Sequence, residues 1–330
     1  MPKTVRFYEL GGPEVLKLEE TEKPAPGDGE VRLRVLATGL NRAEALFMRG
    51  LYFEKPQLPS RIGYEAAGIV DAIGAGVDES WLGKTVATLP GYSQVRYGIL
   101  GEEAVVPASA LAQYPGKLTP VEGAAIWMQY LTAWGALVHY GRVTAEDAVV
   151  IPAASSSVGL AAIQITKDAG ATAIATTRTS KKRKELLELG ADYVIATEEE
   201  DLPARVAEIT GGKGARIIFD PVAGPYVETL AQAAAHGGIL FIYGALSMQP
   251  TPFPTLTAIR RAMTMRGYSL MEYRNQPEVM KAAQKYVYDR LENGSFTPKI
   301  AKTFPLHQAA EAYRYLESNA QVGKVVITVG

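Results

Sequence analysis

The chain is 330 residues long, carries 34 Lys and Arg against 35 Asp and Glu, and contains no cysteine. Its net charge of −1 gives no reason to expect nucleic acid or an anionic membrane as a partner, and the lack of cysteine excludes disulfides and thiolate–zinc sites. The N-terminus has no signal-peptide core, and the most apolar helical stretch, residues 124–138, is too short to cross a bilayer. We therefore expect a cytoplasmic protein with two domains.

The residue pattern divides the chain into three blocks. Residues 1–121 are β-rich, with short alternating runs between glycines and prolines. In residues 122–268 helical and strand patterns alternate, which predicts an α/β fold with a doubly wound parallel sheet. Residues 269–330 are expected to return to the first domain. The sheet strands are expected at 148–151, 173–176, 193–195, 217–219, 239–243 and 265–268.

A turn of small residues separates the first of these strands from a helical pattern that starts at Leu160. Backbone N–H groups and the helix dipole at such a turn can hold a pyrophosphate. Only Gly159 remains of the usual glycine fingerprint, so an ordinary turn in another doubly wound protein is the alternative. The expected pyrophosphate contacts are Ala154, Ser155, Ser156, Ser157, Val158 and Gly159, with Gly244 and Ala245 after the fifth strand.

The second strand ends in a hydroxyl and a basic run rather than in a carboxylate. An NAD-binding protein places Asp or Glu there for the ribose 2′-hydroxyl, whereas Thr177, Arg178 and Lys182 suit a 2′-phosphate. The cofactor predicted from these residues is NADP(H). The alternative is a helix whose basic outer face is simply solvated.

Several short motifs together resemble the zinc-independent medium-chain dehydrogenases/reductases, in particular the quinone oxidoreductase group. The similarity extends over essentially the whole chain and implies a GroES-like β-rich catalytic domain beside a Rossmann domain, with the active site in the cleft between them. The motifs, in chain order, are Gly11–Leu16, Gly39–Glu44, Arg49–Tyr52, Gly63–Gly68, Leu131–Ala133, Gly190–Asp192 and Gly323–Ile327.

The resemblance also implies roles for individual residues. Asn41 and Thr132 would hydrogen-bond the nicotinamide end of the cofactor, although Asn41 could equally cap the helix that follows it. Tyr52 would lie beside the substrate, either as a proton donor or as a pocket wall; with Asn41 it is the candidate catalytic residue. Tyr64, Gln129 and Tyr130 are candidates for the substrate pocket. Trp127 fits a domain-interface core better than a pocket.

No metal site is expected. Zinc-dependent relatives use a cysteine after the first Gly-x turn and a histidine before the Glu of the Gly-x-Glu motif, where this chain has Asn41 and Tyr64. The three histidines are scattered without ligand spacing. Without a Lewis acid, reduction of a quinone or of an enone C=C is favoured over alcohol dehydrogenation, because these acceptors delocalise the arriving charge.

The sequence therefore predicts an NADPH-dependent, zinc-independent reductase of quinones or enones that acts as a homodimer on small molecules. A 2-enoyl thioester reductase acting on acyl-CoA or acyl-carrier protein is one alternative, and a zinc-free alcohol dehydrogenase-like protein is another. A non-enzymatic NADPH-binding role fits least, since aromatic–basic RNA motifs are absent.

Overall fold

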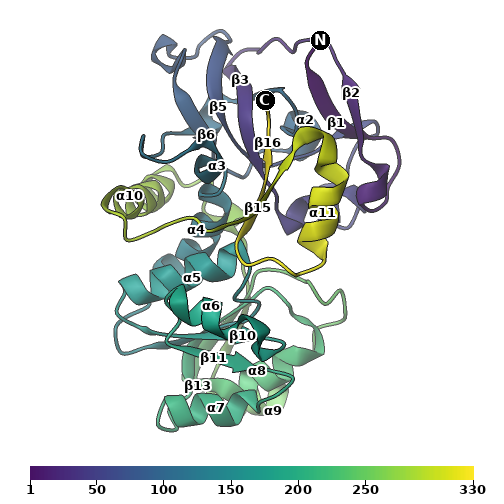
Figure 1. Cartoon of the computed structure of the whole chain (residues 1–330). Helices are drawn as coiled ribbons and strands as arrows, with labels where there is room; N and C mark the ends of the chain where they lie inside the picture. Colours follow the sequence, from purple (N-terminus) through teal and green to yellow (C-terminus); the bar gives the residue numbers. More distant parts are fainter. The chain divides into compact units, whose positions relative to one another are not determined.

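The computed structural model describes residues 1–330, which form two compact units (Figure 1). Unit 1 comprises residues 1–128 and 298–330, and unit 2 comprises residues 129–297. The return to the first unit therefore comes at 298 rather than at the expected 269. The reason is that helix α10 (Pro277–Asn293) packs within unit 2, where Tyr286 Oη donates a 2.7 Å hydrogen bond to Asp168 Oδ2.

Unit 2 is built on six parallel strands in the order β11-β10-β9-β12-β13-β14. This confirms the predicted doubly wound sheet. The strand order reverses between β9 and β12, and such a switch point is where open parallel sheets bind ligands. The strands are β9 (Ala148–Ile151), β10 (Thr172–Thr177), β11 (Tyr193–Ala196), β12 (Ala215–Asp220), β13 (Ala234–Ile242) and β14 (Thr264–Gly267).

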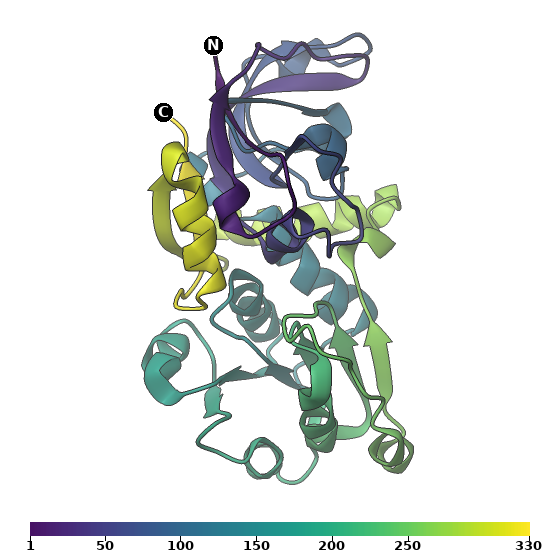
Figure 2. The ribbon, with the colours of Figure 1, turned by 90° about the vertical axis from the view of Figure 1, so that its right-hand side faces the viewer.

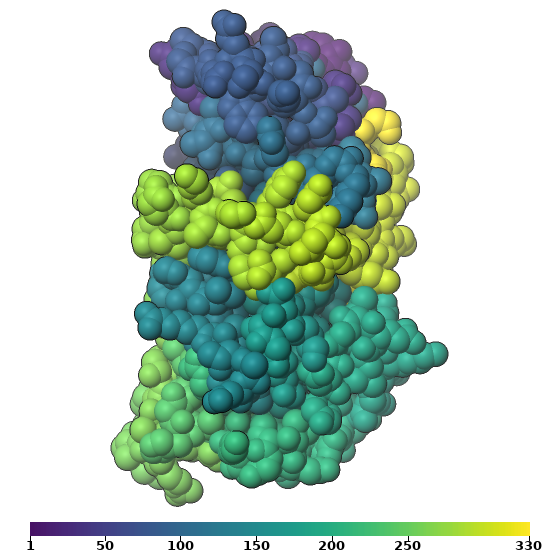
Figure 3. Space-filling model, turned by 90° about the vertical axis from the view of Figure 1, so that its left-hand side faces the viewer, coloured from purple at the N-terminus to yellow at the C-terminus, as the bar shows by residue number.

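Helices cover both faces of this sheet (Figures 1 and 2). Successive strand residues point to opposite faces, so Val150, Ile174 and Ile218 pack in one buried cluster with α7, α8 and α9. Helix α5 lies on the other face, and the outer side of α10 is visible in Figure 3. The remaining elements are α4 (Trp127–Trp134), π-helix η4 (Gly135–Tyr140), α5 (Ser157–Asp168), η5 (Ser180–Lys182), α6 (Arg183–Glu188), α7 (Leu202–Ile209), η6 (Gly224–Tyr226), α8 (Val227–Ala233), α9 (Thr255–Arg261) and η7 (Leu270–Glu272).

Unit 1 is β-rich, as predicted. A small antiparallel sheet has the order β2-β1-β4. A larger, mixed sheet has the order β15-β16-β3-β5-β6-β8 with β7 also paired to β3; β15 and β16 are parallel and the other pairs are antiparallel. The strands are β1 (Lys3–Phe7), β2 (Lys17–Glu20), β3 (Glu30–Gly39), β4 (Ser60–Arg61), β5 (Glu65–Ile73), β6 (Thr85–Thr88), β7 (Glu103–Pro107), β8 (Leu111–Ala112), β15 (Ile300–Pro305) and β16 (Lys324–Thr328).

Short helices close the apolar core of unit 1. Phe7 and Phe47 meet edge to face at 6.0 Å inside a buried cluster that includes Tyr313. No helix in the structure is both long and apolar enough to span a bilayer. The helices of this unit are η1 (Pro13–Val15), α1 (Arg42–Met48), η2 (Glu79–Trp81), α2 (Gln94–Tyr97), η3 (Ala108–Ala110), α3 (Pro120–Gly123), η8 (Leu306–Gln308) and α11 (Ala309–Glu317).

Candidate functional site

The turn between β9 and α5 is tightly packed at the N-terminus of the helix. Ser156 is the N-cap of α5, and its Oγ accepts a 3.0 Å hydrogen bond from Gly159 N. A Cβ on Gly159 would lie 2.6 Å from Ala154 O, so only glycine permits this packing. Ser157 and Val158 form the first turn of α5, whose N-terminus therefore stands at the carboxyl edge of the sheet.

The basic residues after β10 differ in their interaction partners. Arg183 pairs with Glu200, and Lys184 lies 3.8 Å from Glu188. Lys182 instead donates a 3.0 Å hydrogen bond from Nζ to Ser155 Oγ in the β9–α5 turn. Arg178 is exposed and forms no salt bridge. Partial burial and the nearby Arg178 guanidinium lower the pKa of Lys182, while Glu185 acts in the opposite direction.

Two further turns lie at the same edge of the sheet. Asp220, the last residue of β12, is fully buried and accepts hydrogen bonds from Val222 N at 2.8 Å and Ala223 N at 2.9 Å. Burial raises the pKa of Asp220 despite these bonds. A Cβ on Gly244 would lie 2.7 Å from Pro221 O, so the turns after β12 and β13 approach closely at this point. Ala245 follows in the exposed part of the second turn.

Tyr243 is a residue at this edge that the sequence analysis did not single out. Its ring stacks on Phe219 with centroids 3.9 Å apart, and its buried hydroxyl has no hydrogen-bond partner in the structure. Burial and the Asp220 charge raise the pKa of Tyr243, so its hydroxyl stays protonated. Tyr243 follows an apolar strand, so its sequence pattern does not distinguish it from an aromatic residue of the hydrophobic core.

Helix α4 carries three of the predicted residues. Thr132 and Gln129 are both nearly buried, and Gln129 Oε1 accepts no hydrogen bond. Tyr130 lies in the core of unit 2 instead of lining a pocket: its ring stacks on Phe296 at 5.1 Å and its hydroxyl donates to Gln164 Oε1 at 3.0 Å. The placement of Tyr130 differs from the expectation because α4 turns this side chain toward the segment after α10.

In unit 1, Asn41 belongs to a buried polar cluster. Lys324, only 1% exposed, donates from Nζ to Asn41 Oδ1 and to Glu65 Oε2, both at 2.6 Å. Asn41 Nδ2 donates to Gly39 O and to Glu44 Oε1, both at 3.2 Å. Asn41 is also the N-cap residue of α1. Asn41 thus takes its alternative role at the start of the helix, and its contact with the cofactor stays a prediction.

Glu44 joins three segments of this cluster. Its carboxylate accepts hydrogen bonds from Asn41 N at 2.6 Å, from Tyr64 N at 3.1 Å and from Tyr313 Oη at 3.1 Å. Complete burial raises the pKa of Glu44 to about 7, although these donors and Lys324 favour the charged form. Glu44 therefore fixes the backbone of Tyr64 relative to α1 and α11.

Tyr52 and Tyr64 are brought together in unit 1. Their rings lie edge to face with centroids 6.2 Å apart. Burial raises the pKa of Tyr52 to about 12, and the neighbouring Tyr64 hydroxyl acts in the opposite direction. Burial, together with Tyr52 and Glu54, raises the pKa of Tyr64. Gln94 Oε1 accepts a 3.3 Å hydrogen bond from Gly63 N, the residue before Tyr64.

The residues around Asn41 do not fit a metal ion. The oxygen atoms of Asn41 and Glu65 that a cation would use already accept hydrogen bonds from the Lys324 ammonium. No group of three or more His, Cys, Asp or Glu side chains in the structure has the geometry of a metal site. Lys324 and Glu65 were missed as functional neighbours of Asn41 because they lie 283 and 24 residues away in sequence; a charged residue opening an otherwise apolar strand was the only available signal.

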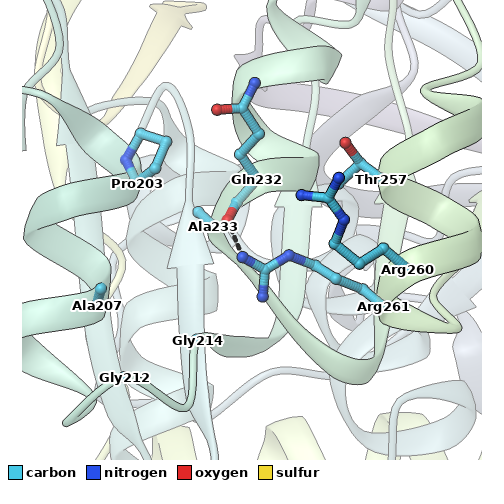
Figure 4. Close-up of a pocket in the computed structure, with 9 residues that line it drawn as sticks. All are labelled: Pro203, Ala207, Gly212, Gly214, Gln232, Ala233, Thr257, Arg260 and Arg261. Atoms are coloured by element: carbon cyan, nitrogen blue, oxygen red, sulfur yellow. Dashed lines mark hydrogen bonds between the residues drawn. The ribbon is translucent and has the colours of Figure 1, made fainter.

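One hollow of unit 2 lies away from these residues. About 400 Å³ in volume, it is lined by the amino ends of β12 and β13 and by α7, α8 and α9 (Figure 4). Arg261 is occupied there by the carbonyls of Gln232 and Ala234. Since parallel sheets bind ligands at the opposite, carboxyl edge, we assign this hollow no part in the reaction.

Comparison with known proteins agrees with this architecture. Residues 27–116 match the alcohol dehydrogenase GroES-like domain family, and residues 157–285 match the family described as zinc-binding dehydrogenase. Quinone oxidoreductase 1 of Escherichia coli (strain K12) is 30% identical over 330 residues, covering 99% of each chain.

Two solved structures are similarly close. Escherichia coli quinone oxidoreductase complexed with NADPH superposes with a TM-score of 0.90 at 29% identity, covering 99% of each chain. A structure described as an NAD-dependent alcohol dehydrogenase gives a TM-score of 0.88 at 32% identity, covering 99% of this chain and 100% of the other. The chain therefore belongs to the medium-chain dehydrogenase/reductase superfamily, in its quinone oxidoreductase-like branch, and is an oxidoreductase.

Proposed function

We propose that the chain is an NADPH-dependent reductase that transfers hydride to quinones or to the activated C=C bond of enones without zinc. The observation that carries this proposal is the arrangement of Arg178, Lys182 and Ser155 at the carboxyl edge of the sheet. Two neighbouring cations there have no use in an NAD site, where a carboxylate would bind the ribose hydroxyls. A 2′-phosphate would relieve the repulsion between them.

The rest of this edge fits a dinucleotide. The N-terminus of α5 would face the pyrophosphate, with the close packing at Gly159 and Gly244 leaving room for it. Gln129 Oε1 offers a buried acceptor that a bound amide could satisfy. When bound, NADPH would supply the hydride; the residues of the chain would hold and orient it.

The acceptor chemistry follows from the residues of unit 1. Tyr52 can donate a hydrogen bond or a proton to a carbonyl oxygen, and Tyr64, whose ring lies edge to face with that of Tyr52, acts to lower the pKa of Tyr52. With Asn41 and Glu65 engaged by Lys324, no Lewis acid is available to activate a simple alcohol. A quinone or enone needs less activation, because it already delocalises the incoming charge.

The similar structures differ in the cofactor that their descriptions name. The Escherichia coli quinone oxidoreductase was solved with NADPH, whereas the alcohol dehydrogenase neighbour is described as NAD-dependent. Arg178 and Lys182 favour the first. The alcohol dehydrogenase reading predicts instead that NAD⁺ and an alcohol support turnover.

The cofactor assignment is tested by Arg178→Ala. A charge-assisted hydrogen bond contributes about 1.5–3 kcal/mol, so the variant should bind NADPH about tenfold or more weakly and leave NADH binding almost unchanged. Lys181→Ala, which removes an exposed neighbouring cation, is the matched control. Equal losses for NADPH and NADH in Arg178→Ala would contradict the assignment.

The acceptor is identified by a panel of NADPH-consumption assays with a quinone, an enone and crotonyl-CoA, together with NADP⁺ and NAD⁺ reduction by simple alcohols. Turnover with the quinone or enone is expected. Turnover confined to crotonyl-CoA would instead support the thioester reductase, and turnover confined to NAD⁺ and an alcohol would support the dehydrogenase.

A further inference from the structure

The three serines of the β9–α5 turn have different partners. Ser156 caps α5 through Gly159 N, and Ser157 begins the helix. Ser155 alone reaches across to the next strand, where its Oγ accepts the 3.0 Å hydrogen bond from Lys182 Nζ. Its hydroxyl is therefore oriented toward the basic run and not toward the helix terminus.

This contact joins two turns that leave the sheet side by side. β9 and β10 are neighbours in parallel register, with Ile151 opposite Ala175, so their carboxyl ends open at one edge. A backbone hydrogen bond of 3.2 Å from Ala154 N to Thr176 O ties the turns together at their base. The Lys182–Ser155 bond ties them at the tip, where the nucleotide would lie.

Lys182 needs such a fixed partner. Its side chain has four rotatable bonds, and the neighbouring Arg178 repels its ammonium group. An ammonium has three N–H donors, so the bond to Ser155 is compatible with a further contact to an anion. The Ser155 hydroxyl thereby holds the Lys182 ammonium close to Arg178, although the two positive charges repel each other. A 2′-phosphate would require the two cations in this position.

We propose that Ser155 is a positioning residue for Lys182 and, through it, a determinant of selectivity for NADPH over NADH. The inference rests on the proposed cofactor. Ser155 would not itself contact the 2′-phosphate. It would fix the position of the Lys182 ammonium before the phosphate binds. The expected consequence is an effect on NADPH that depends on Lys182 and is nearly absent for NADH, which lacks the phosphate.

The test measures the Kd of NADPH and of NADH for the full-length wild type, Ser155→Ala, Lys182→Met and the double variant. Ser155→Ala should weaken NADPH about fivefold and change NADH by less than about twofold, as expected for one hydrogen bond that acts indirectly. In the Lys182→Met background, Ser155→Ala should have almost no further effect on NADPH. Ser155→Thr keeps the hydroxyl and should keep the selectivity.

Binding of 2′,5′-ADP and 5′-AMP to the same variants gives a readout independent of turnover: only the affinity for 2′,5′-ADP should fall in Ser155→Ala. Lys184→Ala serves as the charge control, and the melting temperature checks that each variant is folded. Equal weakening of NADPH and NADH in Ser155→Ala would overturn the inference, because the hydroxyl would then serve a part that both nucleotides share. Additive effects of Ser155→Ala and Lys182→Met would overturn it as well.

Failure of the cofactor assignment looks different. If the wild type shows no preference for NADPH over NADH, and Lys182→Met does not weaken NADPH binding, both the proposed function and this inference are wrong. A wild type that prefers NADPH, a Lys182→Met variant that loses the preference and a Ser155→Ala variant that keeps it would remove the inference alone.

Discussion

In the proposed reaction Tyr52 is the candidate proton donor, and the ring of Tyr64 lies edge to face with that of Tyr52. Burial raises the pKa of both phenols, so both are protonated near neutral pH, and the pKa of Tyr64 is raised further than that of Tyr52. Tyr52 is thus the stronger acid of the two. Whether the reaction uses that acidity depends on the acceptor, because an enolate or hydroquinone anion can also take its proton from water.

Tyr52→Phe tests the role of the hydroxyl. A positioned proton donor contributes about 10²-fold to a rate, and water can replace part of it, so we expect kcat to fall between about threefold and 10²-fold while the Kd of NADPH stays constant. The measurement compares kcat and KM with one quinone and one enone. A fall of less than about threefold with both substrates would leave Tyr52 as an aromatic wall.

The pH dependence follows from the pKa of Tyr52. A pKa of about 12 means that the donor is protonated at all lower pH values and is lost only as the pH rises toward 12. The Tyr52-dependent part of kcat should therefore be constant from about pH 6 to pH 9. Tyr64→Phe removes the neighbouring hydroxyl that acts to lower the pKa of Tyr52, and it should lower kcat without changing this plateau. A loss of activity near pH 8 that disappears in Tyr52→Phe would show that its pKa is much lower.

At the scale of elements, the buried cluster of Asn41, Glu44, Glu65 and Lys324 connects α1, β5 and β16. Each of these elements begins at or next to one of the charged or polar residues. Glu65 also accepts a 3.0 Å hydrogen bond from Met128 N. Buried charges of this kind are stabilising only as a complete set, because removal of one partner leaves another uncompensated.

Lys324→Met should therefore destabilise the protein by about 3–5 kcal/mol, since it leaves the Glu65 carboxylate buried without its cation. In the double variant with Glu65→Gln part of this loss should be recovered, because the unpaired charge is gone. Urea unfolding of wild type, both single variants and the double variant gives the coupling energy. Strict additivity of the two single effects would mean that the ammonium and the carboxylate do not stabilise each other.

The sequence predicted the elements with regular periodicity and missed contacts made over long sequence separations. The predicted strand at 148–151 coincides with β9, and the predicted strand at 193–195 lies within β11. β13, in contrast, begins at Ala234 instead of 239, because Gly237 takes a positive φ of 70° inside a paired segment that reads as a turn. The predicted helix at 124–138 is divided into α4 and a π-helix, where Gly135 packs against Tyr268 and Tyr273.

The candidate site shows the same division. Local motifs predicted a phosphate contact at the turn after β9 and a role for Arg178 and Lys182, since both predictions depend on residues close to strand ends; the phosphate contact stays a prediction. The contact of Lys324 with Asn41 spans 283 residues, and the burial of Tyr130 depends on Phe296. Neither pairing leaves a periodic trace, so only the folded chain brings these residues together.

For the whole molecule, independence from metal is the first expectation. Extensive chelation should leave both activity and melting temperature unchanged, because the chain has no cysteine and the Lys324 ammonium occupies the oxygen atoms nearest to Asn41. Elemental analysis of the purified protein provides the control. Tightly bound zinc in a stoichiometric amount would contradict this prediction.

The second expectation for the whole molecule is a homodimer. β14 pairs with β13 on one side only, so its other side presents unpaired N–H and C=O groups. Close in sequence, Phe253, Leu256 and Ile259 are largely exposed. An open edge beside apolar side chains favours association, and pairing of two β14 strands would satisfy the backbone groups of both copies.

Light scattering at micromolar concentration should therefore give the mass of two chains. Met265→Asp places a charge on β14 and should shift the equilibrium toward the monomer. Leu82→Asp puts the same charge on an exposed leucine of unit 1 and should leave the mass unchanged. A wild-type monomer would contradict the prediction directly, and a dimer that tolerates Met265→Asp as well as Leu82→Asp would place the interface on another surface than the β14 edge.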